Sequence, residues 1–195
     1  MEVFDCGTIE YLPDFLEPAE AGECLARLWR ELAWAQREIT LFGRRVMQPR
    51  LTAWYGEPEA HYSYSGLAHE PMPWHPLLYQ LKGRVEAHTG LSFNSVLANA
   101  YRDGRDSMGW HSDDEKELGP RPVIASLSLG ATRRFRLRKK IRARGKRSDS
   151  IALVLEPGSL LLMKGDSQQQ FQHAVPRTRR DVGLRINLTY RLVTA

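Results

Sequence analysis

Apolar residues recur at the spacing of a single helical face in two segments of the N-terminal half. The first covers residues 18–32 and has glutamates near its start, and the second covers residues 74–88. Gly90 follows the second segment and is a typical helix stop. Residues 39–55 have the composition of extended structure with a turn at Gly43. The pattern therefore predicts two helices with extended structure between them.

Beyond Gly90 the pattern changes to short apolar stretches separated by Gly, Pro, Asp and charged residues, which is typical of antiparallel strands. The expected strands are residues 93–101, 123–129, 135–138, 151–155, 160–163 and 184–192. The last strand alternates most clearly, and its polar face carries Arg185, Asn187, Thr189 and Arg191. We therefore predict a mainly β, α+β fold in which an N-terminal layer packs on an antiparallel barrel or jelly roll.

The composition is that of a globular protein with one domain. Hydrophobic residues make up 42% and charged residues 26% of the 195 residues, which excludes a wholly disordered chain. No apolar stretch approaches the roughly 20 residues that cross a bilayer, and no basic segment precedes an apolar run at the start. Cys6 and Cys24 are too few for a disulfide framework. We expect a single domain over residues 1–195, in the cytoplasm, without membrane contact and monomeric.

Positive charge is concentrated in one segment. The chain has 28 Lys and Arg against 23 Asp and Glu, a net charge of +5. Ten of the 28 lie in residues 133–147, where there is no acid, so the rest of the chain is net negative. Such a block either binds a polyanion locally or is a solvated loop. Arg44 and Arg45 beside Gly43 have the same two interpretations, and Phe42 is either an exposed wedge or buried packing.

One histidine and one carboxylate are spaced to share a metal ion. His111 and Asp113 are two positions apart, so in an extended segment they point to the same side. His173 follows after several expected strands. Two histidines and a carboxylate with open positions suit a non-haem Fe(II) oxygenase. Zinc hydrolysis uses the same kind of ligands, and a surface loop with an ordinary hydrogen-bonded histidine is the simplest alternative.

Two arginines on the last expected strand change this balance. Arg185 and Arg191 share one face, with Asn187 between them. Arginine binds carboxylates bidentately and keeps its charge when it is buried. A cosubstrate with two carboxylates would explain both arginines beside a metal, whereas a zinc hydrolase would not need them. The alternative is a strand face exposed to solvent.

Several separated motifs occur in a recognisable order. They include Asp106–Glu115 (DSMGWHSDDE), His173–Pro176 (HAVP) and Arg185–Arg191 (RINLTYR), with further matches at residues 49–56, 62–66, 99–101 and 124–134. In these stretches the chain resembles the AlkB family of Fe(II)/2-oxoglutarate-dependent dioxygenases, and most closely the branch that repairs alkylated single-stranded DNA and RNA. One departure is Tyr190, which stands where Phe is common in the family and is expected to alter packing only.

The resemblance implies a double-stranded β-helix (jelly-roll) catalytic core in residues 91–195 and a nucleotide-recognition layer in residues 1–90. It implies Fe(II) ligation by His111, Asp113 and His173. The residues implied to hold 2-oxoglutarate are Asn99, Tyr101, Arg185, Asn187 and Arg191, with Arg185 at the distal carboxylate. Those implied to contact the nucleotide are Trp54, Tyr62, Ser63 and Tyr64, with Asp114 or Glu115 beside the iron.

The implied activity is oxidative N-demethylation of bases such as 1-methyladenine and 3-methylcytosine with 2-oxoglutarate and O2, yielding succinate, CO2 and formaldehyde. The partner is alkylated DNA, or RNA, between which the sequence does not decide. Residues 133–147, Arg44 and Arg45 would contact its phosphates. The aromatic residues implied to contact the nucleotide, Trp54, Tyr62 and Tyr64, either stack on bases or are ordinary packing residues. Two other functions stay open: an oxygenase of the same chemistry acting on a protein side chain or small molecule, and a non-catalytic nucleic-acid-binding module.

Overall fold

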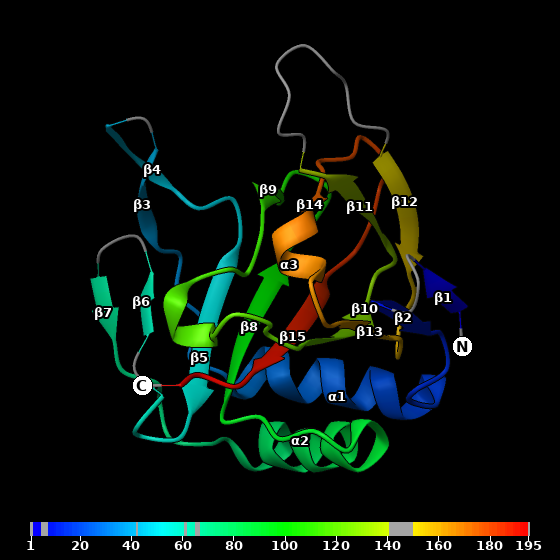
Figure 1. Cartoon of the computed structure of the whole chain (residues 1–195). Helices are drawn as coiled ribbons and strands as arrows, with labels where there is room; N and C mark the ends of the chain where they lie inside the picture. The colour runs from blue at the N-terminus through cyan, green and yellow to red at the C-terminus, as the bar shows by residue number, and fades with distance from the viewer. Residues whose placement is uncertain are drawn as a thin grey trace.

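Two antiparallel sheets form the body of the molecule (Figure 1). The computed structural model describes residues 2–4, 8–41, 43–60, 62–64, 67–140 and 150–194. The larger sheet contains, in spatial order, β1 (Glu2–Phe4), β2 (Ile9–Leu12), β13 (Leu160–Met163), β10 (Ile124–Gly130), β15 (Arg185–Arg191), β8 (Ser95–Tyr101) and β5 (Leu51–Gly56). The smaller sheet contains β12 (Ser150–Leu155), β11 (Arg133–Lys139), β14 (Phe171–Val175) and β9 (Met108–His111).

Two hairpins extend from the N-terminal half beside these sheets (Figure 1). One pairs β3 (Glu38–Leu41) with β4 (Arg44–Met47), and the other pairs β6 (Tyr62–Tyr64) with β7 (Leu67–His69). Gly43 lies at the tip of the first hairpin with φ of 75°, a left-handed conformation that glycine adopts without strain.

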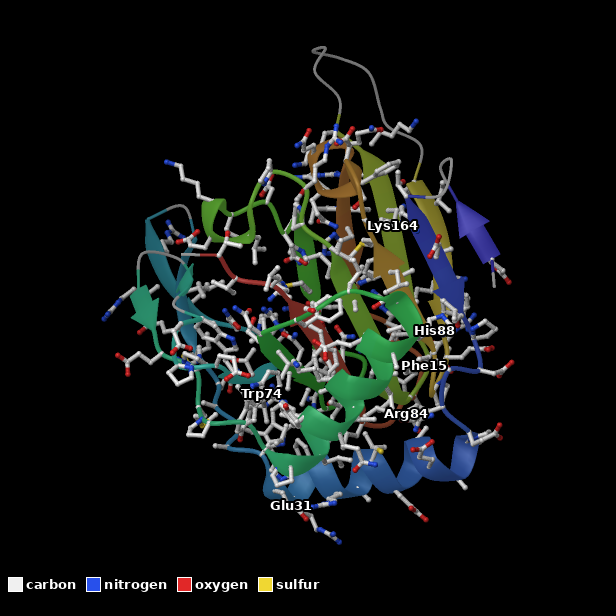
Figure 2. All side chains as sticks on the ribbon, turned by 60° about the horizontal axis from the view of Figure 1, so that its bottom comes forward. Phe15, Glu31, Trp74, Arg84, His88 and Lys164 are labelled. Carbon is white, nitrogen blue, oxygen red and sulfur yellow. The ribbon has the colours of Figure 1, made fainter. Side chains whose placement is uncertain are left out.

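Two helices cover one face of the larger sheet (Figures 1 and 2). They are α1 (Pro18–Glu31) and α2 (Pro76–Thr89), and each begins with a proline, which suits the first helical position. Gly90 ends α2 in the left-handed conformation, with φ of 69°. An ion pair between Arg84 and Glu20 joins the helices. Two short helices follow later in the chain, a 3-10 helix at Lys116–Leu118 and α3 (Ser167–Gln170).

The segment before α1 is held against α2 by an aromatic contact. The Phe15 and His88 rings meet edge to face with centroids 5.7 Å apart, and the Arg84 guanidinium lies 5.7 Å from the Phe15 ring centre (Figure 2). This contact fixes the start of α1 on the helical layer.

The buried apolar residues form two clusters. The first lies between the helices and the larger sheet and includes Leu28, Leu78, Leu81, Leu127, Ile186 and Tyr190. The second lies between the two sheets and includes Tyr11, Ile124, Phe135, Leu137, Met163 and Val175. Burial on both faces makes the larger sheet the rigid centre of the fold, and the polar site described below opens from the second cluster.

The architecture agrees with the predicted mainly β jelly roll carrying N-terminal helices and strands. Both helices and six of the later strands fall where the apolar pattern indicates. The pattern gave no indication of β9 and β14, the two strands that carry His111 and His173. Strands from the first ninety residues, β2 and β5 among them, hydrogen bond within the same sheet as β8 and β15.

Candidate metal and cosubstrate site

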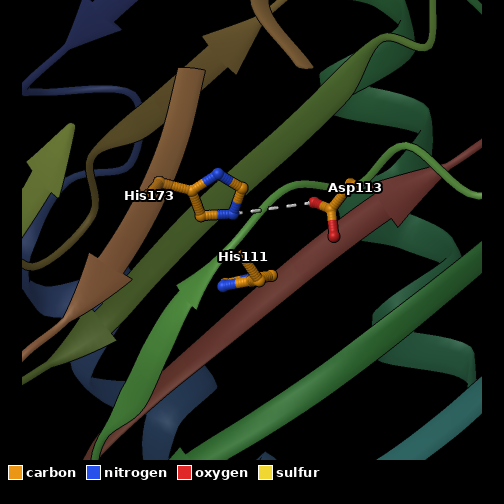
Figure 3. Close-up of side chains that lie close together, drawn as sticks. All are labelled: His111, Asp113 and His173. Carbon is orange, nitrogen blue, oxygen red and sulfur yellow. Dashed lines mark ion pairs between the residues drawn. The ribbon is translucent and has the colours of Figure 1, made fainter. Parts of the chain in front are cut away.

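His111, Asp113 and His173 meet between the two sheets (Figure 3). β9 and β14 pair antiparallel, with His111 directly opposite His173, and Asp113 follows two residues after His111. The potential ligand atoms of the three side chains all lie within 4.8 Å of one another. The two imidazole rings have centroids 4.1 Å apart, and His173 Nε2 lies 3.9 Å from Asp113 Oδ2. Strand pairing thus joins residues that are far apart in sequence.

Contacts around the cluster fix its ligand atoms. The His111 Nδ1 atom lies 2.9 Å from the Gly109 carbonyl oxygen, which leaves Nε2 for a metal. The Asp113 backbone N–H donates to Gln168 Oε1 at 2.9 Å, and Arg191 Nη2 donates to Asp113 Oδ1 at 2.8 Å. Two imidazoles and one carboxylate, held in this way on one side, are a donor set suited to Fe(II) with open positions.

The electrostatics keep these side chains in ligating protonation states. Burial lowers the pKa of His111, and burial together with the neighbouring His111 lowers the pKa of His173 to about 3. Burial would raise the pKa of Asp113, but Arg191 and the two histidines lower it to about 2. At neutral pH both imidazoles are therefore uncharged and the carboxylate is ionised, as metal binding requires.

Arg185 points into the same cavity with donors that have no partner. Its side chain is 1% exposed, and Nη2 donates to Ser128 Oγ at 2.9 Å. Nε and Nη1 are buried and make no hydrogen bond to the described residues. Burial lowers the pKa of Arg185 to about 10, so the guanidinium is charged at neutral pH. An unsatisfied buried cation is costly, and a carboxylate of a bound ligand would satisfy it.

The other predicted cosubstrate residues line the same cavity. Its walls include Asn99, Tyr101, Asn187 and Arg191 as well as Arg185 and the three metal candidates. In the pairing of β8 with β15, Asn99 lies opposite Asn187 and Tyr101 opposite Arg185. Asn187 Nδ2 donates to Ser126 Oγ at 2.8 Å and to the Leu127 carbonyl at 3.1 Å. Asn187 therefore joins β15 to β10 by side-chain hydrogen bonds beside the cavity.

Arg50 is a residue of the cavity that received no role from the sequence, although it lies in the matched segment 49–56. Arg50 is 4% exposed, lines the cavity, and donates from Nε to Asn99 Oδ1 at 2.7 Å. Gln48 and Thr52 also line the cavity, and each has a buried side-chain oxygen without a hydrogen-bond partner among the described residues. The only sequence feature that could have identified Arg50 is its position in the matched segment. The apolar pattern does not distinguish it from the other basic residues.

The residues predicted to contact the nucleotide lie in different environments. Trp54 lines the cavity. Tyr62, Ser63 and Tyr64 form β6, but their side chains lie outside the described part of the molecule. Asp114 is exposed and paired with Lys140 at 2.8 Å. Glu115 is half-buried, and its Oε2 is buried without a hydrogen-bond partner in the described residues.

The basic block is divided by strand alternation. Along β11, Arg134 and Arg136 are exposed and Arg138 is half-buried, whereas Phe135 and Leu137 point inward. Arg133 is 3% exposed, so its inclusion in a phosphate-binding surface is corrected: it faces the interior. Residues 141–147 of the block and Phe42 lie outside the described residues. Arg44 and Arg45 are exposed on β4, and Arg45 pairs with Glu38 at 3.6 Å.

A comparison with protein families decides what kind of site this is. Residues 8–191 match the family described as the 2OG-Fe(II) oxygenase superfamily. The chain belongs to this superfamily. The family's cofactors, Fe(II) and 2-oxoglutarate, are those predicted from the sequence, and the triad of His111, Asp113 and His173 with Arg185 provides donors suited to both.

Individual relatives confirm the resemblance to the AlkB family. "Alpha-ketoglutarate-dependent dioxygenase alkB homolog 3" of Bos taurus is 45% identical over 93% of this chain and 64% of the relative. "DNA oxidative demethylase ALKBH2" of Mus musculus is 40% identical over 90% of this chain and 76% of the relative. The chain thus spans about 64% of the length of the bovine 2OG-Fe(II) oxygenase that it resembles.

A solved structure supports the fold. The chain described as "The structure of OsALKBH1" superposes with a TM-score of 0.63 at 19% identity, covering 94% of this chain and 97% of that one. The described part of this 2OG-Fe(II) oxygenase superfamily member has no helix with the length and apolarity to cross a membrane.

Proposed function

We propose that the protein is an Fe(II)/2-oxoglutarate-dependent dioxygenase that removes N-methyl groups from alkylated nucleobases. One observation carries the proposal. A cluster of half-buried His111 with buried Asp113 and His173 lines the same cavity as Arg185, whose buried Nε and Nη1 have no partner among the described residues. A metal site and an unsatisfied carboxylate receptor in one cavity suit a keto acid that bridges them.

In this proposal the chain positions Fe(II) and 2-oxoglutarate. His111, Asp113 and His173 hold Fe(II) from one side. Arg185 binds the distal carboxylate of 2-oxoglutarate, with Asn99, Tyr101 and Asn187 beside it. Arg191 keeps Asp113 ionised and oriented through the contact at 2.8 Å. Because the walls of the cavity also include Phe135, Met163 and Val175, these apolar side chains limit the access of water.

When bound, Fe(II) with 2-oxoglutarate and O2 supplies the oxidising chemistry. With both bound, one oxygen atom of O2 would enter succinate as 2-oxoglutarate loses CO2, and the other would enter the N-methyl C–H bond. The resulting N-hydroxymethyl group breaks its C–N bond, so that formaldehyde leaves and the base recovers its original nitrogen. The protein contributes the positions and the charges of its side chains, since the cofactor and cosubstrates supply the redox chemistry.

The proposed substrate is a methylated base such as 1-methyladenine or 3-methylcytosine, taken from its stack into the cavity. The mouse relative is named a DNA oxidative demethylase. Trp54 would contact the base from the cavity wall, with Tyr62, Ser63 and Tyr64 of β6 in the same recognition layer. These bases carry a positive charge, and we propose that Glu115, whose Oε2 is buried without a hydrogen-bond partner among the described residues, meets that charge rather than Asp114, which is paired with Lys140.

The proposed phosphate contacts come from the exposed basic residues. On the outer face of the smaller sheet, Arg136 and Arg138 lie over the Trp110 ring at 5.6 and 4.3 Å, with Arg134 beside them on β11. Arg44 and Arg45 present further cations on the β3–β4 hairpin. We further propose that RNA is accepted, that the protein is monomeric and cytoplasmic, and that residues 1–90 form the nucleotide layer of one domain with a catalytic core in residues 91–195.

The test measures formaldehyde release with Fe(II) and 2-oxoglutarate from 1-methyladenine and 3-methylcytosine in single-stranded DNA, double-stranded DNA and RNA. The wild-type protein is expected to release formaldehyde in proportion to succinate, and His111→Ala, which removes one metal ligand, is expected to release neither. Demethylation that persists in His111→Ala would overturn the metal assignment. Succinate formation that another class of substrate stimulates, and methylated oligonucleotides do not, would redirect the proposal to that class.

A further inference from the structure

Arg133 is a buried arginine that holds backbone carbonyls. It begins β11, and its side chain is 3% exposed. Nη1 donates to the Asp103 carbonyl at 3.1 Å, and Nη2 donates to the carbonyls of Asp106 and Pro176 at 2.9 and 2.8 Å. Desolvation lowers the pKa of this guanidinium. The charges of Asp106 and Asp103 offset part of the cost of burying this cation, but its three hydrogen-bond acceptors are neutral carbonyls. A buried arginine that binds carbonyls costs more than an apolar side chain, which suggests a role beyond packing.

The three carbonyls belong to the segments that adjoin the metal-bearing strands. Asp103 and Asp106 lie in the connection between β8 and β9, directly before the strand that ends at His111. Pro176 follows β14, the strand that contains His173. A planar guanidinium can bind all three carbonyls at fixed angles, whereas a lysine ammonium would reach them only as a point charge. Arg133 therefore ties the start of β9 to the end of β14.

This is where the pairing of the two strands is irregular. His173 lies opposite His111 and Val175 opposite Met108, with a register shift between the two pairs. A bulge bends a strand and redirects the side chains near it. A second contact supports the same junction, because the Thr178 N–H donates to the Gly104 carbonyl at 2.8 Å. A side chain at Gly104 would approach the Thr178 carbonyl oxygen to 2.5 Å, so glycine permits this close passage.

Arg133 also contacts the candidate cosubstrate site. Its guanidinium carbon lies 5.6 Å from the centre of the Tyr101 ring, and that of Arg185 lies 5.2 Å from the same ring. The position of Tyr101 is thus shared between a structural arginine and the arginine that faces the cavity.

We propose that Arg133 is a positioning residue of the metal centre, which sets the placement of His111 relative to His173 and orients Tyr101. The proposal rests on the proposed function only in taking these histidines as metal ligands. Arg133 touches no ligand itself, and it acts through β9, β14 and the Tyr101 ring. It is accordingly assigned no phosphate contact, unlike Arg134 next to it.

The test uses Co(II) as the probe, because its binding and visible spectrum report ligand geometry without turnover or nucleic acid. In Arg133→Met the Co(II) dissociation constant is expected to rise about 10- to 100-fold, as is common when the residues that orient a metal ligand are replaced. The visible ligand-field bands should change in shape, and 2-oxoglutarate should bind the Co(II) protein more weakly. Arg30→Met, at an exposed arginine of α1, is the matched control and should titrate like the wild type.

Arg133→Lys separates positioning from folding, because it keeps the charge and the stem but not the planar fork. Lowered Co(II) affinity and an altered spectrum in a Lys variant with wild-type circular dichroism would support the proposal, including when the Met variant does not fold. Wild-type affinity and spectrum in folded Arg133 variants would overturn it, even if their melting temperature falls. Absence of demethylation by the wild-type protein would instead contradict the proposed function and leave this comparison readable.

Discussion

At the scale of single residues, the most informative feature is an arginine without enough acceptors. Arg185 is charged at neutral pH and buried, its Nη2 donates to Ser128 Oγ, and its Nε and Nη1 have no hydrogen-bond partner among the described residues. A fold does not retain such a group for stability, since an apolar side chain would pack there at lower cost. This supports the proposal that Arg185 binds a ligand, and the residue lines the same cavity as the histidine cluster.

Arg185→Met is expected to weaken 2-oxoglutarate binding by about 2 kcal/mol or more, roughly 30-fold or more in Kd, because the carboxylate loses its buried cation. The Co(II) affinity should change little, since Arg185 contacts no metal candidate in the described structure. Calorimetric titration of the Co(II) protein with 2-oxoglutarate measures both, with Arg30→Met as control. An unchanged Kd for 2-oxoglutarate would remove Arg185 from the cosubstrate site.

His173 predicts a pH dependence of the metal-free protein. Its folded pKa of about 3 lies below the ordinary value of 6.5, so the unfolded chain binds a proton first as pH falls. The free energy of unfolding should therefore decrease below about pH 6.5, by about 1.4 kcal/mol per pH unit for this histidine, until the folded pKa is reached. Urea unfolding with a chelator at pH 7.5 and pH 5.5 measures this. His173→Gln should show a smaller decrease, and an equal decrease would contradict the assignment.

At the scale of elements, the sequence predicted the regular pieces better than the ones that carry the chemistry. The alternation in residues 184–192 identified β15 and the face shared by Arg185, Asn187 and Arg191. β9 and β14 escaped prediction because they are short and mix polar with apolar residues (MGWH and FQHAV). Their strand character comes from pairing with each other and with β11, which no local pattern records.

The candidate ligands were nevertheless found, because motif spacing carries them independently of secondary structure. The sequence offered the grouping of His173 with His111 as one of several interpretations and the resemblance favoured it, whereas the structure shows its cause, a direct cross-strand pair. Arg133 could not have been separated from its neighbours by charge counting. Only its inward-facing position on β11 distinguishes Arg133 from the exposed Arg134 and Arg136.

The outward-facing arginines of β11 lead to a prediction of how nucleic acid binding depends on salt. Arg136→Gln combined with Arg138→Gln should weaken binding of a labelled single-stranded oligonucleotide and reduce the slope of log K against log salt by about 0.7 for each phosphate that these arginines neutralise in the wild type. Fluorescence anisotropy over a series of salt concentrations measures the slope. Succinate formation without nucleic acid should persist. An unchanged slope would assign these arginines to a solvated sheet face stacked on Trp110.

At the scale of the whole molecule, the two faces of the larger sheet have different tasks. Helices α1 and α2 seal one face with an apolar core, so β8, β10 and β15 are held from behind (Figure 1). The other face meets the smaller sheet and carries the polar residues of the cavity. The hairpins β3–β4 and β6–β7 come from the N-terminal half, where the predicted nucleotide contacts lie. In the proposed function, the sheets hold the reacting groups rigidly, and the N-terminal half with its hairpins contacts the nucleotide.

Demethylation of a nucleobase in this cavity changes the mass of the substrate, and that mass gives the sharpest test of the proposed function. A single-stranded oligonucleotide with one 1-methyladenine is incubated with the protein, Fe(II), 2-oxoglutarate and O2. Its mass is then measured by mass spectrometry. We expect the product to be lighter by one CH2 unit, the change to need 2-oxoglutarate, and His111→Ala not to produce it. An oligonucleotide of unchanged mass, from folded protein that binds Co(II) and 2-oxoglutarate, would show that this cavity does not demethylate nucleobases.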